Sequence, residues 1–428
     1  MLEAATRALR TPDLRGKILF ALAMIGLFRL GSQVPTPNVN YSTIQDCVAQ
    51  ADSTVTGFIN LFSGGALLQL SVFALGIMPY ITASIILQLL VVVIPRLETL
   101  KKEGQAGQQK ITQYTRYLTV GLAVLQSSTI VALAANQQLP TPGCDSLADD
   151  SVLRLLLMVV VMTAGTAMVM WLGELITDRG VGNGMSVLIF ASIASRIPFE
   201  GAAILETRGA LLFGVLLLLV ALIIGAVVFV EQAQRRVPVQ YAKRMVGRKM
   251  YGGTSTYIPL KVNQAGVIPV IFSSSLLYVP TLVGQAAGED SAVGRFVGRY
   301  LVDPTDPLYL SVYFLLTVFF CFFYVAITFD PNDVADNMKK YGGFVPGIRP
   351  GRPTAEYLDF ILTRLTSAGA LYLGIVAILP FLFFNVVGNA QNFPFGGVAV
   401  LIVVGVGLET VKQIESQLLL RNYEGFLR

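Results

Sequence analysis

Residues 62–90 read FSGGALLQLSVFALGIMPYITASIILQLL, and this stretch decides the fold. It is apolar enough to cross a membrane, yet Ser63, Gly64 and Gly65 interrupt its first third. In hydrocarbon every unpaired backbone N–H or C=O is costly, so irregular chain survives there only when it is buried in protein or lines an aqueous cavity. The interruption therefore predicts a broken membrane helix that lies beside a cavity.

The composition predicts a polytopic membrane protein. Of the 428 residues, 54% are hydrophobic and 13% are charged, and the mean hydropathy is +0.66. The charged fraction is about half of that usual in soluble domains. Spans of roughly 20 apolar residues, with a shorter one at 185–198, are expected at 17–34, 74–94, 117–136, 152–172, 185–198, 209–230, 264–283, 309–328, 358–384 and 396–412.

The basic residues predict the orientation of these ten spans. With the N-terminus in the cytoplasm, alternating crossings place most of the 31 Lys and Arg residues on the cytoplasmic side, as the positive-inside rule requires. Both termini are therefore expected in the cytoplasm, and the basic start of the chain shows no signal-peptide cleavage site. The external loops would hold only Arg154, Arg196, Arg208, Arg295 and Arg299.

Two segments of the chain resemble each other. Gly76–Ser84 and Gly266–Ser274 both read G-x-x-P-x-I-x-x-S, and an odd number of crossings separates them, which implies two inverted halves. Chance is the alternative, because Gly and Pro are frequent in membrane helices. Pro79 and Pro269 are expected to kink their helices. The expected parts are an N-terminal segment 1–16, a first half 17–198 with a plug at 60–72, a second half 209–412 with cytoplasmic loops 231–263 and 329–357, and a tail 413–428.

The sequence offers no group for enzyme or metal chemistry. It has no His and three Cys, which excludes His-dependent catalysis and a structural zinc site. The interiors of the spans hold no Asp or Glu, which ion-coupled transporters and proton pumps need there, since acids such as Glu174, Glu231 and Glu409 lie at cytoplasmic ends. No catalytic residue, metal or cofactor is therefore expected.

Three smaller features have plain alternatives. Gly180-Val-Gly-Asn-Gly184 lacks the strand and the Lys of a phosphate loop, so it predicts a tight turn. Cys47 and Cys144 fall in loops predicted to be external, where a disulfide and two free thiols are both open alternatives. Cys321 lies in mid-span, and we interpret it as a packing residue.

Isoleucines and basic loops are the remaining candidates. Ile77 and Ile81 lie one helical turn apart, as do Ile189 and Ile193, so each pair projects from one face. Helix packing is the plain explanation, but a ring of such residues would form a constriction that excludes water and ions. The excess of basic residues in the loop 231–263 has two explanations. A cytoplasmic loop is basic by the positive-inside rule alone, or the charge serves docking on RNA phosphates or an acidic partner.

The chain resembles the bacterial SecY family, the central channel subunit of the protein translocase, and particularly its actinobacterial members. The resemblance extends over most of the chain. It is carried by FRLGSQVP at 28–35, NLFSGGA at 60–66, the Gly76 segment, GQAG at 104–107, GELITDRG at 173–180, VQYAKR at 239–244, PLKVNQAGVIP at 259–269, PGIRPG at 346–351 and Gly396-Gly397.

This resemblance implies an all-α fold of ten transmembrane helices, in two inverted five-helix halves around a central hourglass pore. Helix 2 would be broken into a plug and a span. The implied pore ring consists of Ile81, Ile193, Ile271 and Ile402, with Ile77 and Ile189 adjoining. The implied plug consists of Asn60, Leu61, Phe62, Ser63, Gly64, Gly65, Ala66, Leu67, Leu68, Gln69 and Leu70.

The family also implies a lateral gate between helices 2 and 3 on one side and helices 7 and 8 on the other. Ser84, Gln126 and Ser274 match polar positions of that gate, where hydrogen bonds of about 0.5–1.5 kcal/mol each would hold it shut. The implied function is to pass unfolded secretory chains outward and to release transmembrane segments into lipid. The alternative is a secondary transporter with inverted repeats.

The partners implied by the family are SecE-like and SecG-like small membrane subunits, the SecA motor ATPase, the ribosome, signal peptides with their nascent chains, and membrane lipid. The chain has no nucleotide site, so these partners would supply the energy. The implied partner-binding residues are Arg235, Arg236, Lys243, Arg244, Arg248, Lys249, Arg349 and Arg352.

Overall fold

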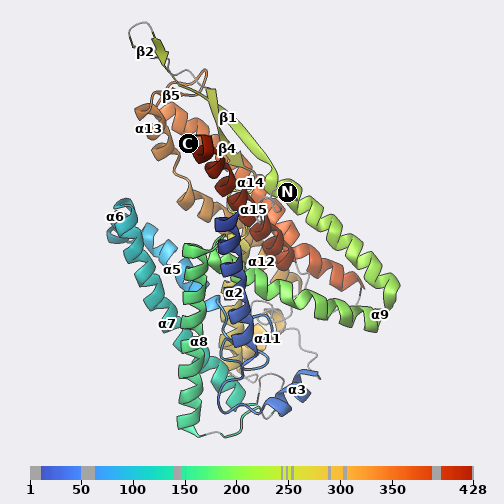
Figure 1. Cartoon of the computed structure of the whole chain (residues 1–428). Coiled ribbons are helices and arrows are strands. Elements are labelled where there is room, and N and C mark those ends of the chain that lie inside the picture. The colour runs from blue at the N-terminus through green and yellow to red at the C-terminus, as the bar shows by residue number, and fades with distance from the viewer. Residues whose placement is uncertain are drawn as a thin grey trace.

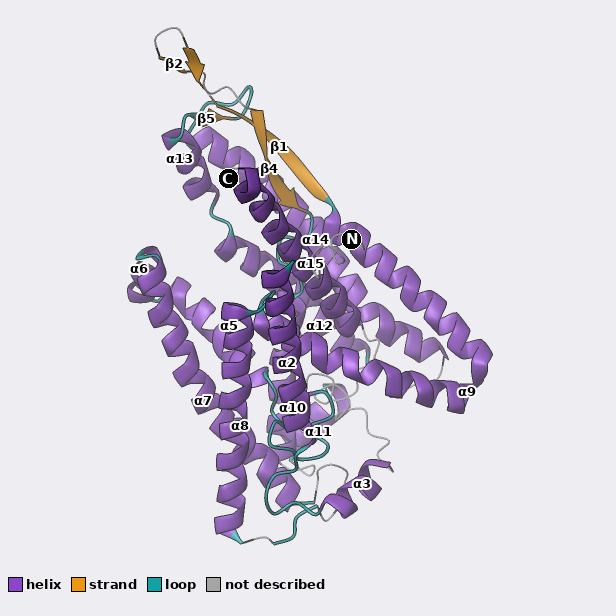
Figure 2. Ribbon diagram, viewed as in Figure 1, coloured by secondary structure: helices purple, strands orange, loops and turns teal. Residues whose placement is uncertain are grey.

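The structure is a computed structural model of the whole chain, and it is built almost entirely of helices (Figures 1 and 2). It describes residues 11–49, 63–137, 144, 146–149, 151–241, 244–246, 249–251, 255–287, 291–301, 306–387 and 397–426.

Among the described residues, the first part of the chain forms seven helices, and the last of them is bent. Gly209, with φ 80° and ψ 164°, divides α9 into two arms that correspond to the expected spans 185–198 and 209–230. The predicted tight turn at 180–184 is confirmed, since it joins α8 to α9. The helices are α2 (Pro12–Gln33), α3 (Tyr41–Ala49), α5 (Met78–Val93), α6 (Pro95–Lys102), α7 (Gln105–Ala135), α8 (Val152–Arg179) and α9 (Gly184–Gln232).

In the described ranges after residue 232, the chain adds six helices and the strands. The helices are α10 (Ile268–Ala287), α11 (Ala292–Tyr300), α12 (Pro307–Thr328), α13 (Pro331–Lys340), α14 (Arg352–Val387) and α15 (Gly397–Phe426). The strands are β1 (Gln234–Tyr241), β2 (Arg244–Val246), β3 (Lys249–Tyr251), β4 (Ser255–Lys261) and β5 (Gly343–Phe344).

Several of these helices are long and apolar enough to cross a membrane. Among the described residues there are five, and α5 with α6, bent by 100° at their junction, makes a sixth. Gly184–Pro198 and Ile268–Leu277 are shorter apolar helices. The second arm of α9 turns large apolar side chains such as Leu211 and Phe229 outward, as a lipid-facing helix does. The chain is therefore a multi-pass membrane protein, while the count of ten spans stays a prediction.

The repeated motif has the same local structure at both of its positions. Gly76 and Gly266 have φ of 54° and 63°, a conformation that glycine adopts without steric cost. The helices then begin at Met78 and Ile268, so that Pro79 and Pro269 are their second residues. The expectation that these prolines kink their helices is wrong, because proline in a first turn has no intrahelical hydrogen bond to lose. They mark helix starts instead.

The two regions expected to be loops meet in a small antiparallel sheet. Its strand order is β4-β1-β5, so β5 from 329–357 pairs with β1 from 231–263. Val237, Val239 and Leu260 are buried on one face and pack with residues of α13 and α14. The β1–β4 hairpin projects from the end of the molecule opposite to α3 (Figure 1). These regions therefore form regular strands rather than irregular loops. We call the hairpin from β1 to β4, together with β5, the ribbon.

A disulfide joins Cys47 of α3 to Cys144, 97 residues later. Two backbone hydrogen bonds support the same junction, from Asn40 N to Ser146 O at 3.0 Å and from Ala148 N to Asn38 O at 3.0 Å. Of the two alternatives that the sequence left open, the structure contains the disulfide. Cys321 is a free thiol buried in α12.

Candidate channel, plug and gate

The isoleucines of the implied pore ring gather in the main hydrophobic cluster of the protein. They come from α5 and the residue before it, from α9, from α10 and from α15, which are far apart in the sequence. Ile77, Ile189, Ile193, Ile271 and Ile402 are buried members of this cluster, and Ile81 packs against it. The helices therefore bring one apolar set together from both parts of the chain, although its role as a pore ring stays a prediction.

The described part of the implied plug is a series of turns that ends in a buried apolar contact. Ala66, Leu67 and Leu70 are buried. Leu67 and Leu70 share a hydrophobic cluster with Ile44 of α3 and with Met158 and Met162 of α8, among others. Asn60, Leu61 and Phe62 lie outside the described residues. The turns at 63–70 thus pack against apolar side chains of neighbouring helices.

Polar contacts fix both ends of these turns. Arg29 of α2 donates a hydrogen bond from a guanidinium nitrogen to the carbonyl oxygen of Gly64 at 3.1 Å. Thr36 donates to the carbonyl oxygen of Leu70 from its hydroxyl at 2.8 Å and from its backbone N–H at 3.1 Å. A Cβ on Gly64 would lie 3.3 Å from the backbone of Ser192, the residue before Ile193. The turns therefore touch the helix that carries part of the isoleucine cluster.

Two of the three predicted gate residues form hydrogen bonds within their own helices. Ser84 accepts a hydrogen bond from Gln88 on α5 at 3.4 Å, and Ser274 donates to the carbonyl oxygen of Ile271 on α10 at 2.8 Å. Gln126 is half-buried on α7. The expected lateral gate lies between α5 and α7 on one side and α10 and α12 on the other, and we call this boundary the seam. Neither of these hydrogen bonds crosses it.

Apolar side chains make the contact across that seam. Ile85 of α5 clusters with Phe272 of α10 and Phe320 of α12. The rings of Phe272 and Phe320 meet edge to face with their centroids 5.7 Å apart. The contact between α5 and α10 is thus held by non-directional burial, which another apolar surface could replace.

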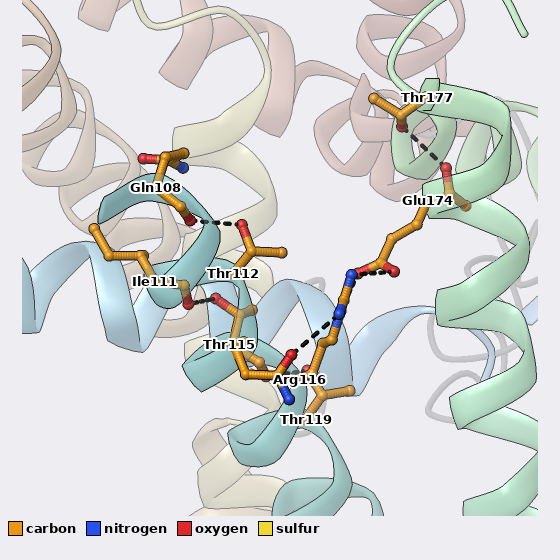
Figure 3. Close-up of polar contacts among 10 residues, drawn as sticks. Gln108, Ile111, Thr112, Thr115, Arg116, Thr119, Glu174 and Thr177 are labelled. Atoms are coloured by element: carbon orange, nitrogen blue, oxygen red, sulfur yellow. Dashed lines mark hydrogen bonds and ion pairs between the residues drawn. The ribbon is translucent and has the colours of Figure 1, made fainter. Parts of the chain in front are cut away.

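An ion pair that the sequence analysis did not identify joins α7 to α8 (Figure 3). The guanidinium of Arg116 donates two hydrogen bonds to the carboxylate of Glu174, each at 2.8 Å. Thr177, one turn after Glu174, accepts a hydrogen bond from Gly184 N at 2.9 Å. Together these contacts connect α7, α8 and the start of α9.

Replacing Arg116 with Ala should destabilise the protein by about 1–3 kcal/mol, because it leaves the carboxylate of Glu174 without its partner. The side chain of Glu174 is only 19% exposed. Lys102→Ala is the control, because its ion pair with Glu98 is exposed on both sides, and such pairs contribute about 0.5 kcal/mol. Denaturant unfolding in detergent measures both changes, and equal changes would contradict the assignment of Arg116 as a helix–helix link.

The implied partner-binding residues that the structure describes lie on the ribbon and beside it. Arg235 and Arg236 are exposed on β1, and the guanidinium of Arg236 stacks on Tyr257 at 4.8 Å from the ring centroid. Arg349 is exposed, and Arg352 pairs with Glu356 at 3.0 Å. Arg244 and Lys249 lie on β2 and β3 at the tip of the hairpin, whereas Lys243 and Arg248 lie outside the described residues.

The fold is that of solved protein-conducting channels. A structure titled "The structure of a protein conducting channel" has a TM-score of 0.66 and 16% identity, over 94% of this chain and 92% of that one. A structure of SecY, whose title says that its plug domain stabilises the closed state of the channel, has a TM-score of 0.63 and 18% identity, over 94% and 92%. The canine Sec61 channel in a ribosome–channel complex has a TM-score of 0.62 and 17% identity, over 94% and 92%.

The fold is thus the polytopic, all-α fold of these channels. The chain belongs to the SecY family, whose model matches residues 71–411. Protein translocase subunit SecY of Mycobacterium tuberculosis (strain ATCC 25618 / H37Rv) is 60% identical, and that of Streptomyces galbus is 61% identical, each over the full length of both chains. The family consists of translocation channels and not of enzymes.

Proposed function

We propose that this chain is the channel-forming subunit of a protein translocase in the cytoplasmic membrane. It passes unfolded secretory polypeptides outward and releases their transmembrane segments sideways into lipid. The observation that carries the proposal is the gathering of isoleucines from α5, α9, α10 and α15 in one apolar cluster. Aliphatic side chains offer no site that would hold an ion or a polypeptide backbone, so such a constriction excludes water when closed and does not trap a passing chain.

The turns at 63–70 act as a plug in this proposal. They are seated by a few contacts at their ends and by the burial of Leu67 and Leu70. Burying a leucine contributes about 1.5–3 kcal/mol, which is enough to favour the closed state and small enough for an arriving polypeptide to overcome. The turns adjoin Ser192 and hence the isoleucine cluster, so their displacement would free the pathway.

Lateral release takes place where α5 and α7 meet α10 and α12. The apolar contact of Ile85 with Phe272 and Phe320 supports this assignment. An apolar segment of a nascent chain can replace the contact without a loss of buried area, whereas a polar segment cannot. Ser84, Gln126 and Ser274 would then form hydrogen bonds with the entering chain rather than with each other.

The exposed basic ribbon is the docking surface for partners on the cytoplasmic side. Its arginines and lysines suit the phosphates of ribosomal RNA and acidic surfaces of a motor ATPase. Titles of similar structures name ribosome complexes of other channels. The excess of Lys and Arg in the predicted cytoplasmic segments puts both termini on the same side as the ribbon. Small SecE-like and SecG-like subunits complete the assembly.

Photo-crosslinking to a stalled secretory chain tests the channel. A photoreactive amino acid at Ile81 or Ile271 should crosslink to a polypeptide arrested during translocation, because both residues face the proposed pathway. Leu222 serves as the control, since its side chain is 67% exposed on the second arm of α9, where lipid is expected. Crosslinks at Ile81 and Ile271 that reach only lipid or small solutes would contradict the channel and favour the transporter.

A further inference from the structure

The base of the basic ribbon lies directly between two membrane helices. Helix α9 ends at Gln232 and β1 begins at Gln234, while β4 ends at Lys261 and α10 begins at Ile268. The backbone N–H of Val262 donates to the carbonyl oxygen of Ala233 at 3.0 Å, which closes the base of the hairpin. A movement of the hairpin is therefore passed directly to the junction of α9 and α10.

A buried amide joins the two sides of this junction. The side-chain amide nitrogen of Asn263 donates to a carboxylate oxygen of Glu231 at 2.6 Å and to the carbonyl oxygen of Gly266 at 3.1 Å. Asn263 is 2% exposed. Glu231 belongs to the last turn of α9, and Gly266 belongs to the turn before α10. One side chain thus fixes the end of α9, the end of the hairpin and the start of α10 together.

Two more helices enclose the same turn. A Cβ on Gly369 of α14 would overlap the carbonyl oxygen of Val262, and a Cβ on Gly405 of α15 would overlap the side chain of Val267. The turn therefore has little room to change shape on its own, so a displacement of its first residues is passed on to the helix that follows.

The hairpin itself is stiff enough to transmit a displacement. Its two long strands pair over seven residues, from Gln234 with Lys261 to Gln240 with Ser255. The buried face of the hairpin packs on α13 and α14. Ile271 of the isoleucine cluster and Phe272 of the seam both lie in the first turns of α10. A rigid element that receives partners is thus attached to the helix that carries residues of both the pathway and the gate.

We propose that Glu231 and Asn263 are positioning residues that couple the hairpin to α10, so that docking of a partner on the ribbon shifts α10 relative to α5. This inference rests on the proposed functions of the ribbon and of the seam, and it adds the two side chains that connect them. The charge-assisted hydrogen bond between them holds the junction as one unit. Loss of this bond uncouples docking from gate movement and leaves docking itself intact.

The test measures docking and gate movement separately in the full-length channel. Nitroxide labels on Gln88→Cys and Leu276→Cys, both exposed residues of α5 and α10, report the distance across the seam. Purified bacterial ribosomes are the probe, and their binding is titrated in parallel. In the labelled parent, ribosome binding should change this distance.

Variants of Glu231 and Asn263 should affect the distance across the seam without affecting ribosome binding. Asn263→Ala and Glu231→Ala should bind ribosomes with the parent Kd and lose most of the distance change. Glu231→Gln keeps an acceptor oxygen for Asn263 and should retain the change. Gln232→Ala, next to Glu231 and exposed, is the matched control. Asn263→Ser is the milder variant if Asn263→Ala does not fold.

Three outcomes would overturn the inference. One is a parent-sized distance change in Asn263→Ala or Asn263→Ser, and another is a loss of the change in Gln232→Ala as well. The third is a loss of ribosome affinity large enough to explain the missing distance change. Glu231 and Asn263 would then shape the docking surface only. A parent channel that binds no ribosomes would refute the docking proposal itself, and the Ile81 and Ile271 crosslinks would still decide the channel function.

Discussion

Deletion of residues 62–70 should make the resting channel leak ions while polypeptide translocation continues. The deletion removes Leu67 and Leu70 from their apolar contacts and removes the carbonyl groups that Arg29 and Thr36 hold. In the proposed channel, the isoleucine cluster would then be the remaining barrier between the two aqueous sides. Single-channel conductance in planar bilayers measures the leak, and transport of a secretory chain into vesicles measures the retained function.

The control for this deletion keeps the length of the chain and changes only its side chains. Replacing Leu67 and Leu70 by Ser preserves the turns but removes most of the apolar burial, which contributes about 1.5–3 kcal/mol for each leucine. This variant should show brief openings instead of a constant leak. If the conductance of the deletion variant equals that of the parent, residues 62–70 are not a plug.

Gly165→Val on α8 should strongly lower the free energy of unfolding. Gly165 lies directly against the chain before α5, and a Cβ there would overlap the carbonyl oxygen of Val72. Backbone cannot rotate away as a side chain does, so α8 and the segment before α5 must separate. Overpacking typically costs about 1–3 kcal/mol, and we expect at least the upper end of that range here. Thermal unfolding in detergent, followed by circular dichroism, measures it.

Gly121→Val on α7 is the matched control, because Gly121 is exposed and a Cβ there would meet nothing within 4 Å. Both variants make the same chemical change in a long membrane helix. Their unfolding temperatures should therefore differ widely, with Gly121→Val close to the parent. A similar loss in both variants would mean that valine itself, and not the contact with Val72, destabilises these helices.

Apolar periodicity and charge were sufficient to predict the class of fold. Long runs without charge predicted α7, α8 and the second arm of α9, because lipid-facing helices need apolar side chains on every face. The tight turn at 180–184 was predicted because this glycine-rich segment lacks the strand and the Lys of a phosphate loop. These features depend on the local sequence alone.

Features that depend on distant partners could not be predicted. The ion pair of Arg116 with Glu174 joins residues 58 positions apart, and no spacing rule connects them. The pairing of β1 with β5 likewise joins separate regions, although the alternating burial of Val237 and Val239 fits a strand. Proline at positions 79 and 269 was misinterpreted because its effect depends on where the helix begins, which the glycines at 76 and 266 determine.

The bond between Cys47 and Cys144 closes a loop that contains the turns at 63–70, α5, α6 and α7. During synthesis this disulfide therefore cannot form until Cys144 has reached the side of the membrane on which Cys47 lies. Cys47 consequently keeps a thiol that can be alkylated for at least the time needed to make the next 97 residues. Its loss of reactivity toward an impermeant alkylating reagent would time the insertion of α7 in growing chains.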